Sequence, residues 1–416
     1  MATLRSFNRA ARLFLLAIVI DGIIFSFWQL FFNFFILAKG FDKVFLGEVN
    51  SIPSIAGLLF AIPIGQLSDR MGRRKAMLAG LALTCLGMGL QALSSHPALL
   101  IGMAFIGGLG SNLFMLSQAP FMMKTSTPAN RTLLFSLNFG LQALSGAVGN
   151  LFAGQLPGFF SQVLHVPPES AAAYQAILLC SVILGGLALI PIFMIHEPVE
   201  KPGEVVRPKS KPLRQVLLQP LVIRLILPQL LIGLGASLLI PYINIFLQER
   251  FNLTSQVIGT IFSLSALLTG LGSLLGPRLA RKMGSKVRTV ATTQLASLVF
   301  LLLAGFTPWA WLSSASLLAR GTLMNMAAPL YTAFAMEQVE VNQQGVINSA
   351  LNLFWQMGYA VGPFISGVVQ EQFGFSPLFI ATAVLYFCAA SLTWIFFKEH
   401  EKVGAPAIVG LAQPGK

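Results

Sequence analysis

Residues 65–75 read GQLSDRMGRRK, a polar and basic stretch at the junction of two long apolar runs. The runs, at 45–66 and 76–94, are each long enough for a helix to cross a hydrocarbon core about 30 Å thick. A segment inside lipid must satisfy its own backbone polar groups, and a helix does so. The stretch 65–75 is therefore predicted to connect two transmembrane helices.

The same alternation of apolar runs and polar connections extends over all 416 residues. Charged residues make up only 10% of the chain, against roughly 25% in an ordinary soluble domain. The mean hydropathy is +0.77. We therefore expect an all-α polytopic membrane protein in a lipid bilayer. Its twelve predicted transmembrane helices lie at 12–38, 45–66, 76–94, 97–124, 131–156, 172–196, 219–247, 255–276, 288–306, 309–337, 345–369 and 377–397.

Lys and Arg are sorted between the two sides of this arrangement. Of the 27 basic residues, 23 fall in connections or chain ends on one side. Only Lys39, Lys43 and Arg250 fall on the other side, and Arg320 lies inside a helix. Basic residues accumulate on the cytoplasmic side of membrane proteins, so both termini are predicted to be cytoplasmic, in a plasma (cytoplasmic) membrane. Because the formal charge of +13 is distributed over these connections, we expect no nucleic-acid partner.

The longest polar segment divides the chain into two halves. We predict an N-terminal six-helix bundle over 1–196, a cytoplasmic linker over 197–218, a C-terminal six-helix bundle over 219–398 and a cytoplasmic tail over 399–416. The halves match each other at a spacing of about 211–213 residues, which indicates a duplicated six-helix unit. Parallel repeats of this kind place a substrate site between the halves, near the middle of the bilayer. The matched segments are 33–37 with 244–248, 65–72 with 276–284, and 136–149 with 349–362.

The stretch 65–75 also resembles the signature loop of a known family. Its residues match the G-x-L-x-D-R-x-G-R-R loop of the major facilitator superfamily at Gly65, Leu67, Asp69, Arg70, Gly72, Arg73 and Arg74. A degenerate copy lies in the matching connection of the second half, where Ala280 replaces the acidic residue. The resemblance implies two pseudo-symmetric six-helix bundles and transport by alternating access. It identifies neither a subfamily nor a substrate.

The motif is predicted to form part of a cytoplasmic gate. Gly65 and Gly72 allow a tight turn and a close approach of helices. Asp69 is expected to pair with Arg73 or Arg131 at a helix end, where such charges are favourable. A simpler interpretation is that the basic residues only hold the connection in the cytoplasm. The predicted gate comprises Gly65, Asp69, Arg70, Gly72, Arg73, Arg74 and Arg131.

Two ionisable residues lie well inside the predicted helices, Asp21 in the first and Arg320 in the tenth. A charge at the bilayer centre costs about 2.5–3.5 kcal/mol, so it usually faces a partner or a water-filled cavity. Both residues lie at a similar depth, and the resemblance implies that their helices line a central cavity. Asp21 is therefore predicted to carry the coupled proton, and Arg320 to bind an anionic substrate group through paired hydrogen bonds. A static ion pair between the two helices is the alternative.

Further candidates for substrate binding are aromatic or polar. Phe25, Trp28 and Phe32 follow Asp21 at helical spacing, on a face suited to a large apolar or amphipathic ligand. Packing against lipid or a neighbouring helix is the simpler interpretation. Some of the polar candidates are expected to join helices instead of binding substrate. They are Asn112, Gln118, Gln229, Tyr242, Asn244, Asn325, Tyr331, Asn352 and Gln356.

Motifs of other functional classes are absent from the sequence. There is no P-loop for ATP-driven transport, and no nucleophile–base pair or metal-binding cluster that would indicate an enzyme. The three cysteines all lie inside apolar runs and predict no disulfide framework. We therefore expect neither an enzyme nor a metal site, and no cofactor besides a proton gradient.

These features predict a secondary active transporter, which we expect to be a monomer. Proton-coupled export of an amphipathic or hydrophobic small molecule by an antiporter is the leading interpretation. Uptake or exchange of an organic anion bound through Arg320 is the alternative, followed by flipping of a lipid-like substrate. A membrane receptor or scaffold on a transporter fold is the alternative from a different class, although the gate motif and the two buried charges disfavour it.

Overall fold

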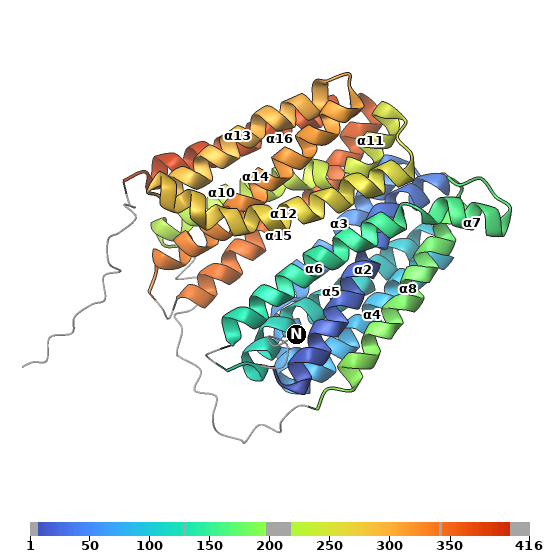
Figure 1. Cartoon of the computed structure of the whole chain (residues 1–416), viewed down its shortest axis with the longest axis horizontal. Coiled ribbons are helices and arrows are strands. Elements are labelled where there is room, and N and C mark those ends of the chain that lie inside the picture. Colours follow the sequence, from blue (N-terminus) through green and yellow to red (C-terminus); the bar gives the residue numbers. More distant parts are fainter. Residues whose placement is uncertain (1–6, 128–129, 197–217, 341–342, 400–416) are drawn as a thin grey trace, which may run out of the picture.

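Twelve long helices dominate the computed structural model, which describes residues 7–127, 130–196, 218–340 and 343–399 (Figure 1). The first half contains α2 (Arg9–Ala38), α3 (Lys43–Met71), α4 (Arg73–Leu93), α5 (Pro97–Thr125), α6 (Arg131–Ala153), the short α7 (Leu156–Leu164) and α8 (Ala171–Phe193). The second contains α10 (Pro220–Leu239), η1 (Ile240–Tyr242), α11 (Ile243–Phe251), α12 (Ser255–Met283), α13 (Lys286–Phe306), α14 (Ala310–Glu337), α15 (Gln344–Phe373) and α16 (Ser376–Phe397). The predicted linker 197–218 and tail 399–416 lie almost entirely outside the described residues.

The helices pack into two bundles, one from each half of the sequence (Figure 1). In the first bundle α2 packs against α6 and α8, and α5 packs against α3 and α4. In the second, α10 packs against α15 and α16, and α14 packs against α12 and α13. The two sets of contacts correspond under the sequence repeat, so the predicted pair of pseudo-symmetric six-helix bundles is confirmed. The bundles meet where α3 lies against α15 and α6 lies against α12.

Nine helices in the described part of the chain are long and apolar enough to cross a membrane, with Pro220–Phe251 counted as one span. The other three of the twelve, α6, α14 and α15, contain no stretch of membrane-spanning length that is as apolar. Their polar residues include Asn138 and Gln142 on α6, and Asn348 and Asn352 on α15. Because polar side chains lower the hydropathy of a helix, these three are the helices in which a polar face is expected.

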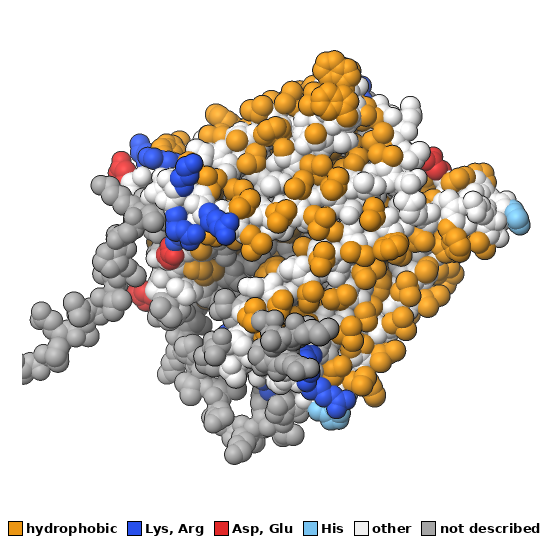
Figure 2. Space-filling view, in the orientation of Figure 1, with side chains coloured by type: hydrophobic (Ala, Val, Ile, Leu, Met, Phe, Trp, Pro, Cys, Tyr) orange, Lys and Arg blue, Asp and Glu red, His pale blue; other side chains and the backbone are white. Residues whose placement is uncertain are grey.

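The two ends of the paired bundles differ in charge. One end, which we call the basic end, carries the basic connections at 70–75 and 278–288. Figure 2 shows Lys and Arg side chains gathered toward this end, while apolar side chains cover the flanks of the helices. The opposite end carries α7 and the first turns of α3 and α12. This arrangement is typical of a protein whose apolar flanks face lipid.

Two connections and one helix differ from the sequence-based prediction. The stretch 65–75 is almost entirely helical, because only Gly72 separates α3 from α4, and its φ of +85° favours glycine. Segment 157–171, which separates the predicted helices 131–156 and 172–196, contains most of α7. The predicted helix 219–247 is interrupted at η1, where Pro241 lacks the backbone N–H that a regular helix needs.

Close packing inside the second bundle depends on glycine. A Cβ atom at Gly358 of α15 would collide with the backbone of Gly233 on α10. Small residues let helix backbones approach in this way inside a membrane. Gly358→Ala is therefore expected to destabilise the protein by about 1–3 kcal/mol, the usual cost of overpacking. The measurement is the temperature at which purified protein in detergent loses its monodisperse state.

The matched control is Gly140→Ala on α6, where no atom lies within 4 Å of an added Cβ. This control is expected to keep the midpoint temperature of the wild type. Equal midpoint temperatures for the two variants would contradict the packing interpretation of Gly358.

Candidate functional site

A pair of asparagines joins the two bundles. Asn33 of α2 donates through Nδ2 to Asn244 Oδ1 of α11 at 3.1 Å, and also to the carbonyl of Pro241. Asn244 Nδ2 in turn donates to the carbonyl of Leu30 at 2.9 Å. Asn33 and Asn244 are 211 positions apart, and Leu30 and Pro241 have the same spacing in the sequence. The hydrogen bonds are therefore exchanged between equivalent residues of the two halves, with near two-fold symmetry.

Two glycine contacts flank this asparagine pair. A Cβ at Gly47 of α3 would lie 2.5 Å from the carbonyl oxygen of Pro363 on α15. A Cβ at Gly259 of α12 would lie 2.6 Å from the carbonyl oxygen of Asn150 on α6. These two contacts are also equivalent under the repeat. Together with the asparagine pair they form a cross-bundle contact, which we call the seal, toward the end opposite the basic end.

A charged contact lies at the surface beside the seal. Lys43 Nζ of α3 lies 2.7 Å from Glu249 of α11, and the backbone N–H of Lys43 donates to Glu371 of α15 at 3.1 Å. Lys43 thus connects the first bundle to two helices of the second. Because the ion pair is partly exposed, it is worth at most about 1 kcal/mol.

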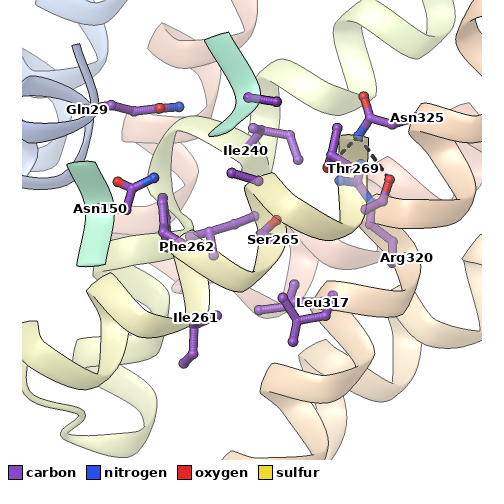
Figure 3. Close-up of a pocket in the computed structure, with 15 residues that line it drawn as sticks. Gln29, Asn150, Ile240, Ile261, Phe262, Ser265, Thr269, Leu317, Arg320 and Asn325 are labelled. Carbon is purple, nitrogen blue, oxygen red and sulfur yellow. Dashed lines mark hydrogen bonds between the residues drawn. The ribbon is translucent and has the colours of Figure 1, made fainter. Parts of the chain in front are cut away.

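A cavity of about 360 Å³ lies between the bundles, next to the seal (Figure 3). Small-molecule sites in proteins typically measure about 300–1,000 Å³. The walls are mainly aliphatic and come mostly from the second bundle. The lining residues are Gln29, Ala143, Asn150, Ile240, Ile243, Ile261, Phe262, Ser265, Ala266, Thr269, Leu317, Leu318, Arg320, Gly321 and Asn325.

Arg320 is the charged residue in this lining. It is only 6% exposed, and its Nη2 donates to the hydroxyl of Tyr386 on α16. The guanidinium carbon also lies 5.3 Å from the centre of the Tyr386 ring, whereas Nε has no hydrogen-bond partner. No carboxylate in the described part of the chain forms an ion pair with Arg320. A buried guanidinium without a counter-charge is costly unless a ligand or water satisfies it.

Asp21 lies in the other bundle, half-buried on α2. It interacts electrostatically with Cys85 of α4 and is not among the residues that line the cavity. Within the described residues it forms no hydrogen bond or ion pair. The alternative interpretation, a static ion pair of Asp21 with Arg320, is therefore not observed in this conformation, where Tyr386 holds Arg320 inside the second bundle.

The sequence matches the family model of the Major Facilitator Superfamily over residues 13–363 and, in a second match, over 225–410. The chain belongs to this superfamily. The resemblance drawn from the stretch 65–75 is thereby confirmed, and with it the assignment of the protein as a membrane transporter.

Several curated members of the superfamily are similar over most of their length. An uncharacterised MFS-type transporter of Bacillus subtilis, YuxJ, is 27% identical over 89% of this chain and 92% of its own. The multidrug resistance protein MdtG of Dickeya zeae is 26% identical over 85% of this chain and 84% of its own. The methylenomycin A resistance protein of Bacillus subtilis is 24% identical over 85% of this chain and 86% of its own.

Solved structures with the same fold include two other transporters. A bacterial homologue of the human lysosomal transporter Spinster, in an inward-facing and unoccupied conformation, has a TM-score of 0.78 at 14% identity, covering 93% of this chain and 96% of its own. The nucleoside transporter NupG has a TM-score of 0.74 at 16% identity, covering 94% of this chain and 100% of its own. At these identities the likeness concerns the fold alone.

Several residues predicted to bind the transporter's substrate join helices in this conformation. Asn112 of α5 donates to the carbonyl of Pro53 on α3 at 3.4 Å, besides the carbonyl of Gly108 in its own helix, and packs against Gly57 of α3. The hydroxyl of Tyr242 donates to the carbonyl of Pro363 at 3.0 Å, and that of Tyr331 to the carbonyl of Leu225 at 2.6 Å. Asn244 forms the hydrogen bonds of the seal described above. Polar contacts of this kind are common between transmembrane helices.

The remaining polar candidates are divided between the cavity and other surfaces. Asn325 lines the cavity and donates to Thr269 at 3.4 Å (Figure 3). Asn352 is exposed and donates to the carbonyl of Asn348 at 2.9 Å. Three glutamines are half-buried, and they stay predictions: Gln118, Gln229 and Gln356. Arg320 and Asn325 are thus the predicted substrate residues that line the cavity.

The aromatic face predicted after Asp21 is divided. Trp28 stacks on Phe32 with 4.8 Å between ring centres, and Phe32 is buried in the core between the helices. Phe25 is 55% exposed. None of the three lines the cavity. The residue of α2 that does line it is Gln29, on a neighbouring face of the helix.

The predicted gate residues lie at the basic end. Asp69 pairs with Arg73, whose Nη1 also donates to Ser68 at 2.8 Å. Arg74 donates to the carbonyl of Phe193. Arg70 is exposed, and Arg131 Nε lies 3.5 Å from Ser126 Oγ. Gly65 lies inside α3 with no atom within 4 Å of an added Cβ, so no turn or close contact requires glycine there in this conformation.

Five residues of the site were not singled out from the sequence. Gln29 lies eight positions after Asp21 in an otherwise apolar stretch, which was a usable signal. The other three polar lining residues are Asn150, Ser265 and Thr269, and they resemble many small polar residues elsewhere in the chain. Tyr386 was hidden because its helix is the last of the chain and carries no charge.

The charged contact beside the seal allows the first site prediction. Lys43→Glu replaces the cation with a carboxylate beside Glu249 and Glu371, so attraction becomes repulsion. Losing about 1 kcal/mol and adding repulsion is expected to raise the population with separated bundles at this end by roughly three- to tenfold. The distance between spin labels at Glu169 and Trp309, one on each bundle, measures this separation after the native cysteines are replaced.

The control is Lys398→Glu, which makes the same charge change at an exposed site of the basic end. It is expected to leave the distance distribution unchanged. An unchanged distribution in the Lys43→Glu protein as well would show that Lys43 does not hold the bundles together.

Proposed function

We propose that this transporter exports an amphipathic or hydrophobic small molecule in exchange for protons, by alternating access to a central site. The cavity between the bundles is the observation that carries the proposal. Its walls are mainly aliphatic, with a few neutral polar groups and one guanidinium. An apolar wall suits the body of such a molecule, and a few polar groups orient it.

The orientation follows from the sorting of charge. Basic residues favour the cytoplasmic side, so the basic end is assigned to the cytoplasm of a cell whose plasma membrane holds the protein as a monomer. The seal then closes the outer side. The asparagine pair, the two glycine contacts and the Lys43 contacts are the interactions that must break before the cavity can open outward. The asparagine and Lys43 contacts among them are polar, and they act beside the close packing of α3 on α15 and of α6 on α12.

Asp21 is the proposed proton carrier. It is an ionisable residue inside a transmembrane helix, and such residues usually mark ion or substrate pathways. Within the described residues no cation pairs with it, so its carboxyl group is free to gain and lose a proton as its surroundings change. Its place in the first bundle, with Arg320 in the second, separates the proton from the substrate.

The names of two relatives support the direction of transport. MdtG is named a multidrug resistance protein, and another relative is named a methylenomycin A resistance protein. Uptake or exchange of an organic anion is the second candidate, favoured by Arg320 in the cavity wall. The two candidates differ in the direction in which a proton gradient drives the substrate.

Asp21→Asn provides the test. Purified protein in proteoliposomes is given an imposed pH gradient and dansylglycinamide, a neutral amphipathic fluorophore. In the wild type, protons moving down their gradient should drive the fluorophore in the opposite direction. Asp21→Asn keeps the shape of the side chain but cannot release a proton. It is expected to reduce gradient-driven flux by at least about tenfold, because ionisation of the carrier is the step that couples the two movements.

Exchange of the fluorophore without a gradient separates loss of coupling from loss of binding, and it should persist in the Asp21→Asn protein. Glu169→Gln, an exposed carboxyl outside the long helices, is the matched control and should behave as the wild type. Full gradient-driven flux in Asp21→Asn would exclude Asp21 as the proton carrier. Gradient-driven accumulation in the same direction as the protons would favour uptake over export.

A further inference from the structure

Arg320 is held in place by its own bundle. Its partner Tyr386 is fully buried on α16, and the Tyr386 hydroxyl accepts a hydrogen bond from Nη2. The Tyr386 ring packs against Gly235 of α10, and Thr382 donates to the Gly235 carbonyl at 3.0 Å. The phenol is therefore fixed between two helices, and the guanidinium that it holds is positioned in the cavity wall without help from a ligand.

The positive charge of Arg320 has no counter-charge in the described part of the chain. Tyr386 and Tyr359, which interact with the guanidinium, are phenols. The Nε–H has no acceptor although it is buried. Charge-assisted hydrogen bonds to a guanidinium are strong and frequently paired. The side chain thus has both an unsatisfied charge and an unused donor at the edge of an apolar cavity.

The residues around Arg320 in the cavity indicate which kind of ligand group can bind to it. Asn325, Thr269 and Ser265 are neutral, and the wall beyond them is formed by Leu317, Phe262 and Ile261 (Figure 3). We propose that Arg320, positioned by Tyr386, is a subsite for a carboxylate or similar anionic group of an amphipathic substrate whose apolar body lies against this wall. This inference names the substrate class of the proposed transporter, and it rests on the proposed function only in that the ligand is the transported molecule.

The internal repeat separates this role from a structural one. The position equivalent to Arg320, 213 residues earlier, is Gly107. The matching position of α8, counted like Tyr386 from the first residue of its helix, is Ser181, which donates to the carbonyl of Leu178 at 2.7 Å instead of holding a cation. The first bundle therefore builds the same six-helix arrangement without an arginine at this position. Packing of the six-helix unit therefore does not require Arg320. The free-energy cost of burying its charge indicates a role other than packing.

Binding of matched fluorophores tests the subsite directly. Dansylglycine carries a carboxylate, dansylglycinamide is neutral, and dansylethylenediamine is a cation, while the aromatic body is the same in all three. Each is titrated against the full-length protein in detergent and followed by its fluorescence. The wild type is expected to bind dansylglycine at least about tenfold more tightly than the amide, because paired charge-assisted hydrogen bonds are stronger than neutral ones. The cation should bind most weakly.

Three variants assign the selectivity to its residues. Arg320→Gln should lower the affinity for dansylglycine by at least about tenfold and leave that for the amide within about twofold, so the selectivity disappears. Arg320→Lys keeps the charge but not the paired donors, and should show intermediate selectivity. Tyr386→Phe keeps the ring but frees the guanidinium, and should reduce the selectivity without changing affinity for the amide. If Tyr386 only contributed to packing of the bundle, the Tyr386→Phe protein would keep the anion selectivity of the wild type.

The outcomes separate the subsite from the transport proposal. A wild type that binds the amide as tightly as dansylglycine, or an Arg320→Gln protein that keeps the anion preference, would overturn the subsite. Where Arg320→Gln does not fold, the comparison of Arg320→Lys with the wild type still decides. Anion-selective binding without proton-driven flux of any of the three probes would leave the subsite standing and refute export. Proton-driven export without anion selectivity would support export and refute the subsite.

Discussion

The exchange of hydrogen bonds between Asn33 and Asn244 fixes the relation of the two bundles on which the site depends. Each amide donates to the other half, and both are buried, so separating the bundles would leave polar groups that only water could satisfy. An unsatisfied buried group costs about 1–3 kcal/mol. Because the partners are equivalent residues of the two halves, the contact brings the matching faces of both bundles together. The glycine contacts beside it allow α3 to approach α15 and α12 to approach α6, and the cavity is the space left next to them.

Symmetry also distinguishes scaffold from site. Asn112 and Asn325 occupy equivalent positions and donate to equivalent carbonyls, those of Gly108 and Gly321. This hydrogen bond is made in both halves and therefore belongs to the six-helix unit, although Asn325 also lines the cavity. Each of the two buried charged residues, in contrast, occurs in one half only. The residue equivalent to Arg320 in the repeat is Gly107, and the residue equivalent to Asp21 is Ile232. Placing an ionisable residue inside the membrane costs free energy. The halves differ at these two positions, so the charges are not needed for the symmetric packing of the helices.

The fold was readable from the sequence because it follows from one-dimensional patterns. Apolar run length gave twelve helices, and the stretch 65–75 identified the superfamily. The role of a polar residue was less accessible, since it depends on the direction of a side chain around its helix. Asp21 and Arg320 lie at similar depth, yet the first lies beside Cys85 and the second lines the cavity. Likewise Phe32 is buried while Gln29, on the neighbouring face of α2, lines the cavity. The break at Pro241 was concealed by the apolar residues around it.

The placement of the anion subsite within a single bundle has a mechanical consequence. Arg320, Tyr386 and the lining residues Ser265 and Thr269 all belong to the second bundle, whose internal contacts do not cross the seal. When the bundles rock, these groups move together and the geometry around the anion is preserved. The first bundle reaches the cavity through Gln29 and Asn150, and Asn150 also accepts the close approach of Gly259 in the seal. A ligand that spans from Arg320 to Gln29 would therefore contact both bundles beside the contacts that hold them together. Binding and opening are then linked through neighbouring residues, without a long-range path through the protein.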